Sequence, residues 1–136
     1  MKSKKAKDLM VRPVISAREN ASVRDISLQL LTGFYSGMPV TDEEGKVVGM
    51  VTELDILALI QKGRELNKIT AGDIMVKKVT TADVNTPIEE IINIILDKDI
   101  IRLPVTEKGR LVGVIARCDI LKNYIEPEFA TYGLLS

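Results

Sequence analysis

The chain has 136 residues, of which 46% are hydrophobic and 28% charged, as in ordinary globular proteins. Its 19 basic and 19 acidic residues balance, which gives no electrostatic reason to expect nucleic acid or an anionic membrane as a partner. It has no histidine and one cysteine, Cys118, which excludes an internal disulfide, the usual zinc ligand sets and histidine-dependent nucleophiles. Because it also lacks an apolar run of membrane-spanning length and a signal peptide, we expect a cytoplasmic protein with no catalytic residues and no metal site.

Two copies of one pattern follow each other along the chain. AKDLM at 6–10 recurs as AGDIM at 71–75, and MPVT at 38–41 recurs as LPVT at 103–106. After a one-residue gap in a turn, GKVVGMVTELDIL at 45–57 matches GRLVGVIARCDIL at 109–121. These ordered matches indicate an internal duplication. The predicted segments are a basic tail at 1–5, the first repeat at 6–62, a linker at 63–70, the second repeat at 71–125 and a C-terminal tail at 126–136.

Each repeat has the pattern of a βαββα unit, which predicts an α+β fold with two small sheets. In the first repeat we expect an extended segment at 12–16, a helix beginning after Asn20 or Ser22, strands at 38–41 and 47–52 around Gly45, and a helix at 53–61. In the second we expect an extended segment at 77–81, a helix capped by Thr86 with Pro87 in its first position, strands at 103–106 and 111–115 around Gly109, and a helix at 117–125.

The helix at 54–60 is apolar on almost every side, which predicts cover on more than one side. The other repeat can cover one side, and the remaining surface suggests a homodimer through this helix and the one at 119–125. Leu121, Tyr124 and Ile125 are the candidate interface residues of the second helix. The alternative is complete burial of the helix within one chain. The tail residues Tyr132, Leu134 and Leu135 either dock on a neighbour or fray.

The end of each hairpin carries the candidate chemistry. Thr52 and Asp55 have the spacing of a capping box, in which a hydroxyl and a carboxylate satisfy the first N–H groups of a helix. In the second copy Ala116 cannot cap, yet Asp119 remains, which indicates a further duty. A carboxylate there can accept ribose hydroxyls, and a threonine hydroxyl with free backbone N–H groups suits ribose or phosphate oxygens. The preceding glycine would let a ligand approach the backbone.

The duplicated unit, its opening D-[LI]-M, its [ML]-P-V-T strand and its G-h-[VI]-[TA]-x-x-D-I-L ending resemble the CBS (cystathionine β-synthase) domain over about residues 6–125. The resemblance implies a stand-alone tandem pair: two βαββα repeats packed with pseudo-twofold symmetry, which usually dimerises into a flat disk. Such pairs are regulatory modules that require no cofactor and bind AMP, ADP, ATP or S-adenosylmethionine in clefts between the repeats. An effector protein regulated by this chain would be a separate chain.

Carried over residue by residue, the resemblance implies two ligand clefts. In the first, Asp55 and Thr52 would hold ribose and phosphate, Thr80 or Thr81 would contact adenine, and Arg102 would reach phosphate. The first cleft comprises Thr52, Asp55, Val79, Thr80, Thr81, Ile101, Arg102, Leu103 and Pro104. The second comprises Val14, Ile15, Ser16, Tyr35, Ser36, Met38, Pro39, Arg117 and Asp119, and lacks one hydroxyl because residue 116 is alanine. As alternatives, both arginines are surface charges and Tyr35 is a structural loop aromatic.

Two other functions fit the same residues. One is a structural dimerisation module with non-functional ligand clefts, which Ala116 favours in one cleft. The other is an enzyme that uses Asp55 and Asp119 as an acid–base pair. The repeat relation places these two carboxylates in separate clefts, and no nucleophile or metal site converges on either. We therefore expect no enzymatic activity.

Overall fold

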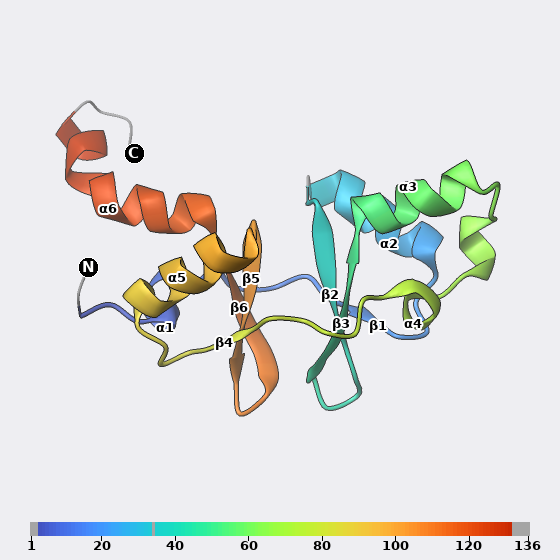
Figure 1. Ribbon diagram of the computed structural model, residues 1–136, viewed down its shortest axis with the longest axis horizontal. Helices are drawn as coiled ribbons and strands as arrows, with labels where there is room; N and C mark the ends of the chain where they lie inside the picture. Colours follow the sequence, from blue (N-terminus) through green and yellow to red (C-terminus); the bar gives the residue numbers. More distant parts are fainter. Residues whose placement is uncertain (1–2, 34, 132–136) are drawn as a thin grey trace. The chain divides into compact units, whose positions relative to one another are not determined.

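A computed structural model describes residues 3–33 and 35–131, and for 126–131 it describes the backbone alone (Figure 1). The predicted tail residues Tyr132, Leu134 and Leu135 lie outside the described residues. In chain order the elements are α1 Ala6–Leu9, β1 Ala17–Arg18, α2 Val23–Gly33, β2 Gly37–Thr41, β3 Val47–Thr52, α3 Glu53–Gln61, the 3-10 helix η1 Leu66–Lys68, α4 Ala71–Ile74, β4 Ala82–Asp83, α5 Ile88–Lys98, β5 Arg102–Glu107, β6 Arg110–Ala116 and α6 Arg117–Thr131.

The chain forms two compact units, each built on one three-stranded sheet. Unit 2 consists of Ile15–Val79 and Gly109–Leu111, and unit 1 consists of the described residues up to Val14, Thr80–Lys108 and those from Val112 onward. The strand orders are β1-β2-β3 and β4-β5-β6. In each sheet the short first strand pairs in parallel with the next strand in the order. The predicted α+β class and both hairpins are confirmed.

The helix that opens each repeat packs against the core of the other repeat. In unit 1, Ala6 of α1 is fully buried and its N–H donates to the carbonyl oxygen of Thr86 at 2.9 Å. In unit 2, Ala71 of α4 is fully buried and its N–H donates to the carbonyl oxygen of Ala21 at 2.9 Å. Each unit therefore combines segments of both repeats. The sequence pattern did not predict these helices, because four residues are too few to show helical periodicity.

The longer helices lie on one face of the sheet in each unit, α2 and α3 in unit 2, α5 and α6 in unit 1 (Figure 1). In α5, Ile88, Ile91 and Ile95 recur at helical spacing and are at most 6% exposed. Each such side chain stabilises the fold by about 1.5–3 kcal/mol through burial. In α3, by contrast, only Ile56 and Leu59 are buried.

The first strand of each unit begins later than predicted. Pairing with the next strand occurs at Ala17–Arg18 and Ala82–Asp83 rather than in the predicted segments 12–16 and 77–81. The chain just before those segments instead forms single bridges to the last strand of a hairpin, Val11 to Val114 in unit 1 and Val76 to Met50 in unit 2. Residues 12–16 therefore connect the bridge at Val11 to β1, and residues 77–81 connect the bridge at Val76 to β4.

Helix ends differ from the prediction at two places, Thr86 and the end of α6, and at Ser22 the structure decides between two predicted starts. The hydroxyl of Thr86 accepts a hydrogen bond from the N–H of Asp83 at 3.1 Å, so it does not cap α5, whose N-cap residue is Pro87. Ser22 caps α2 by accepting from the N–H of Asp25 at 3.1 Å. Helix α6 continues to Thr131, beyond its predicted end at 125.

A methionine side chain fills the space next to a glycine in the last strand of each hairpin. A Cβ atom at Gly49 would overlap Sδ of Met75 and lie 2.7 Å from its Cγ, within unit 2. At Gly113 it would lie 2.5 Å from Sδ and 2.9 Å from Cγ of Met10, within unit 1. The prediction that this glycine leaves room for a ligand is therefore wrong, because a methionine of the same unit occupies that room.

We predict that Gly49→Ala destabilises the protein by about 1–3 kcal/mol, because the new methyl group overlaps Met75 at several atoms. Urea unfolding of Gly49→Ala, Met75→Ala and the double variant measures the coupling between the two positions. The alanine at position 49 should be much less costly when Met75 is already shortened. Additive losses would contradict this packing explanation.

Candidate functional site

The candidate residues gather where the last strand of each hairpin runs directly into a helix. In unit 2, β3 ends at Thr52, which pairs with Gly37 across the hairpin. The N–H of Glu53, the first residue of α3, donates to the carbonyl oxygen of Ser36 at 2.9 Å. In unit 1 the N–H of Arg117 likewise donates to the carbonyl oxygen of Ile101 at 3.2 Å. In both units, the first residue of the helix is therefore hydrogen-bonded to the residue that precedes the first strand of the hairpin.

The capping box at the start of α3 is confirmed. The carboxylate oxygen Oδ2 of Asp55 accepts from the N–H of Thr52 at 2.8 Å and from its hydroxyl at 3.0 Å. The N–H of Asp55 donates in turn to Oγ1 of Thr52 at 3.4 Å. Among the described residues, Oδ1 of Asp55 accepts no hydrogen bond. The box therefore holds the carboxylate in place through one oxygen and leaves the second oxygen available.

Asp119 retains half of the same capping arrangement. Its Oδ2 accepts from the N–H of Ala116 at 2.7 Å. The argument that Asp119 has a further duty because Ala116 cannot cap is therefore weakened, since the backbone half of a capping box needs no side chain at the first position. What the second copy lacks is a hydroxyl that could accept from the N–H of Asp119.

In the described part of the chain, a hydrogen bond from a backbone N–H to an aspartate three positions later lies at the start of four helices, α1, α3, α4 and α6. Besides Asp55 and Asp119, Asp8 accepts from the N–H of Lys5 and Asp73 from that of Thr70, both at 2.9 Å. For Asp73 the hydrogen bond from the backbone of Thr70 lowers the pKa of the carboxyl group, with smaller contributions from the Thr70 hydroxyl and Arg64.

Few backbone donors remain at the start of α3. The N–H groups of Thr52, Glu53 and Asp55 donate to Asp55, Ser36 and Thr52 respectively. The expectation of free backbone N–H groups at this helix start is therefore wrong for these three residues. What the junction does offer a ligand is a hydrogen-bond acceptor, the second oxygen of Asp55.

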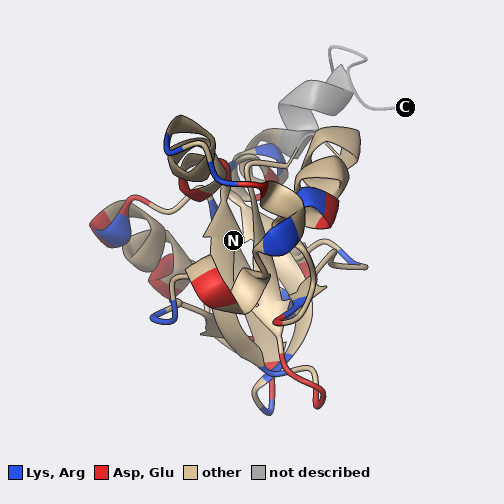
Figure 2. Cartoon of the chain, turned by 90° about the vertical axis from the view of Figure 1, so that its right-hand side faces the viewer, with Lys and Arg blue, Asp and Glu red and all other residues tan. Residues whose placement is uncertain are grey.

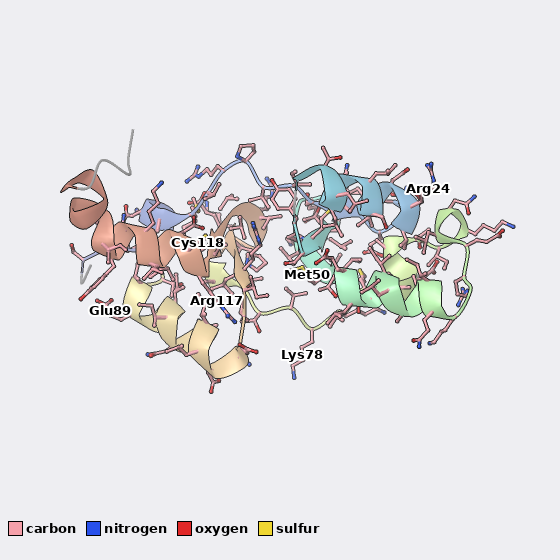
Figure 3. All side chains as sticks on the ribbon, turned by 90° about the horizontal axis from the view of Figure 1, so that it is seen from above. Arg24, Met50, Lys78, Glu89, Arg117 and Cys118 are labelled. Carbon is pink, nitrogen blue, oxygen red and sulfur yellow. The ribbon has the colours of Figure 1, made fainter. Side chains whose placement is uncertain are left out.

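The guanidinium of Arg117 is engaged inside unit 1. Its Nε donates to the carbonyl oxygen of Ile100 at 2.6 Å, and its Nη2 lies 2.8 Å from Oδ1 of Asp99. Asp99 follows the last residue of α5 with φ 53°, so this side chain joins the start of α6 to the end of α5 (Figure 3). Arg102 also has an interaction partner. Sequence reasoning missed Asp99, because nothing in its spacing links it to residue 117.

Tyr35 packs against the end of α2. A Cβ atom at Gly33 would overlap Cε2 of the Tyr35 ring, and the ring is packed against the core of unit 2. Both the glycine and the ring are half-buried. The structural reading of this aromatic is therefore supported by its packing.

The structure brings together residues that the family resemblance assigns to different clefts. At the junction of unit 2, Thr52 and Asp55 lie beside Ser36, and at the junction of unit 1, Arg117 lies beside Ile101. The remaining unit 2 candidates are Ile15, Ser16, Tyr35, Met38, Pro39 and Val79, and those of unit 1 are Val14, Thr80, Thr81, Arg102, Leu103, Pro104 and Asp119. Met38, Pro39, Leu103 and Pro104 are buried. The assignment to two clefts stays a prediction.

The face of the molecule shown in Figure 2 carries charges of both signs. On the face shown in Figure 2, basic and acidic residues are interspersed along helices and turns. Within residues 3–33 and 35–131, no three histidine, cysteine, aspartate or glutamate side chains are grouped as metal ligands. No helix in that part of the chain is both long and apolar enough to cross a membrane.

Comparison with protein families and sequences places these features in a known context. The family model described as CBS domain matches residues 6–62 and 71–126. An inosine-5′-monophosphate dehydrogenase of Methanocaldococcus jannaschii is 31% identical over 93% of this chain, which spans only 25% of the length of that protein. Hypoxic response protein 1 of Mycobacterium tuberculosis is 25% identical over 89% of this chain and 85% of its own length.

Solved structures share the fold. The CBS domain pair of protein MJ0100, in complex with 5′-methylthioadenosine and S-adenosyl-L-methionine, superposes with a TM-score of 0.76 at 29% identity, covering 89% of this chain and 95% of that one. Hypoxic Response Protein I, solved with two coordinated zinc ions, superposes with a TM-score of 0.80 at 25% identity over 88% of this chain and 98% of its own. The predicted resemblance to a tandem CBS pair is confirmed.

We predict that Asp73 contributes to the pH dependence of stability. Because its pKa is lower in the folded chain, its stabilising contribution is complete above the pKa of the unfolded chain and is lost as the pH falls through the folded pKa. Asp73→Asn should therefore lower the free energy of unfolding at neutral pH, and the difference from wild type should shrink in acid. Chemical denaturation from neutral to acidic pH measures this. Asp97→Asn, an exposed change on α5, is the control, and an equal profile for both variants would contradict the prediction.

Proposed function

Since the chain belongs to the CBS-domain family, we propose that it is a non-catalytic regulatory module that binds an adenosine ligand, from the class of AMP, ADP, ATP and S-adenosylmethionine. The observation that carries the proposal is the held carboxylate of Asp55, with one oxygen bound to Thr52 and the other available. The related pair of MJ0100, 29% identical, was solved with two adenosine compounds.

Asp55 has the chemistry to recognise a ribose. Its carboxylate accepts hydrogen bonds and cannot donate them, and the two vicinal hydroxyls of a ribose are donors. Because Oδ2 is held by two bonds at 2.8 and 3.0 Å, the carboxylate needs little ordering when a ligand binds. A preorganised acceptor of this kind favours a ribonucleoside over a ligand without vicinal hydroxyls.

The proposed ligand sites keep the residue sets that the resemblance implies. Thr52 and Asp55 act with Val79, Thr80, Thr81 and the stretch 101–104 in one cleft. Asp119 and Arg117 act with Val14, Ile15, Ser16, Tyr35, Ser36, Met38 and Pro39 in the other. Met38 and Leu103 are 1% and 0% exposed as whole residues, so neither is accessible to a ligand without a change in its surroundings.

Ligand binding would act on a separate effector protein by shifting populations. A ligand biases a conformational equilibrium only as far as its affinities for the two states differ. The chain would therefore report the ligand by favouring one arrangement of the module.

We further propose that the protein is a homodimer. On α3, Leu54, Leu57 and Ile60 are 77%, 58% and 55% exposed, and on α6, Leu121 and Tyr124 are 61% and 70% exposed. In unit 1 an apolar groove of about 390 Å³ lies between α5 and α6, lined mainly by Ile92, Ile95, Leu96, Ile120, Leu121 and Tyr124. Apolar faces of this kind typically mark interaction surfaces, and two copies of one chain can cover each other.

We predict that adenosine ligands raise the melting temperature of the wild-type protein and that Asp55→Ala reduces this shift. Thermal unfolding with AMP, ATP, 5′-methylthioadenosine and S-adenosylmethionine at millimolar concentration measures the effect. Asp8→Ala, which removes the equivalent bond at the start of α1, controls for loss of capping alone. If no ligand raises the melting temperature of the wild type, and the wild type and Asp55→Ala dimerise equally, the purely structural alternative is supported instead.

We predict that Leu54→Glu weakens dimerisation at least about tenfold, because it places a charge in the apolar face of α3. Sedimentation velocity over a range of protein concentrations measures the dissociation constant. Gln61→Glu adds the same charge to the exposed end of the same helix and should leave it nearly unchanged. Equal behaviour of the two variants would place the interface elsewhere.

A further inference from the structure

The start of α3 carries negative charge beside the proposed ligand-binding carboxylate. Its first turn contains two carboxylates, Glu53 and Asp55, and no basic residue. Glu53 is exposed, next to the capping box that holds Asp55. At the equivalent place in the second copy, α6 begins with Arg117 followed by Asp119, so the charges there balance.

Three of the backbone N–H groups at this helix start are already engaged. A helix N-terminus attracts phosphate through unsatisfied N–H groups. Here the N–H groups of Thr52, Glu53 and Asp55 already donate to groups of unit 2. The hydroxyl of Thr52 is also engaged, because it donates to Oδ2 of Asp55 at 3.0 Å. The junction thus presents an acceptor and negative charge, and few donors.

We propose that the Asp55 site selects adenosyl ligands whose 5′ substituent is neutral or cationic, and that Glu53 is the residue that disfavours polyphosphates. This inference rests on the proposed function. A ribose donates its hydroxyls to Asp55 whatever it carries at the 5′ position, but a triphosphate also brings several negative charges next to Glu53. A thioether is neutral and a sulfonium is positive, so neither is repelled.

A relative supports the same ligand class independently of these charges. The CBS domain pair of MJ0100 was solved with 5′-methylthioadenosine, a neutral thioether, and with S-adenosyl-L-methionine, a sulfonium. That complex belongs to the other protein, and it shows that the fold accepts such adenosyl compounds.

Two sets of basic residues oppose this selectivity: Arg102, which the resemblance assigns to phosphate in the same cleft, and the lysines nearest along the bridged backbone. Val76 pairs with Met50, two residues before Thr52, and Lys77 and Lys78 follow on the same segment (Figure 3). Both lysines are exposed. If they drew phosphate to this site, ATP would bind more tightly than the uncharged thioether, and the proposal would be overturned.

The experiment measures affinities by titration calorimetry in an Asp119→Ala background, which removes the corresponding carboxylate of the second copy. The probes are 5′-methylthioadenosine, AMP and ATP. We expect the affinity to fall in that order, and Glu53→Gln to raise the affinity for ATP about three- to tenfold while changing that for the thioether little. The gain should diminish at high salt. Glu43→Gln, which removes an exposed carboxylate from the hairpin turn, is the matched control.

Two kinds of failure are distinguishable. If none of the probes binds, or if Asp55→Ala leaves their affinities unchanged, the proposed function itself fails. If the probes bind through Asp55 but Glu53→Gln changes the ratio of ATP to thioether affinity no more than Glu43→Gln does, the selectivity proposal is overturned and the proposed function stands.

Discussion

The structure depends on one recurring hydrogen bond, from the backbone N–H of a helix N-cap residue to a carboxylate three positions later. Asp8, Asp55, Asp73 and Asp119 all make it, at 2.7 to 2.9 Å. Without it, an N–H at the junction would lack a partner at the point where the chain changes from extended to helical. Because the carboxylate is held through one oxygen, the direction of its other oxygen is fixed as well. At Asp55 a structural bond would thereby prepare the binding group of the proposed site.

The duplication and the packing are linked through two motifs that look unrelated in the sequence. The D-[LI]-M segment opens each repeat and the glycine of G-h-[VI]-[TA] lies near its end, yet in unit 2 Met75 of the second repeat packs on Gly49 of the first. Met10 packs on Gly113 in the same way in unit 1. Each repeat thus supplies the other with a helix and a methionine. One repeat alone would lack both, so we infer that the pair folds together.

Sequence patterns predicted what depends on local periodicity and failed where tertiary contacts decide. The hairpins, their glycine turns and the bounds of α3 followed from alternation, turn chemistry and the capping box. The pairing of Arg117 with Asp99 joins residues 18 positions apart, and no local pattern signals it. The helices α1 and α4 are too short to show a period. Thr86 has the sequence of a helix cap, but its hydroxyl accepts from Asp83 instead.

The comparison of the two copies also changes what their difference means. Judged by motif, Ala116 marks the poorer site because a hydroxyl is missing. Judged by hydrogen bonds and charge, the hydroxyl of Thr52 is already engaged, and the copy that contains it also contains Glu53. The α6 start lacks the hydroxyl but has a guanidinium, held by Asp99 and Ile100. On the proposed function, we therefore expect the two helix starts to differ in the charge they accept beside a ribose more than in their ability to hold one, because each retains its aspartate in the same backbone bond.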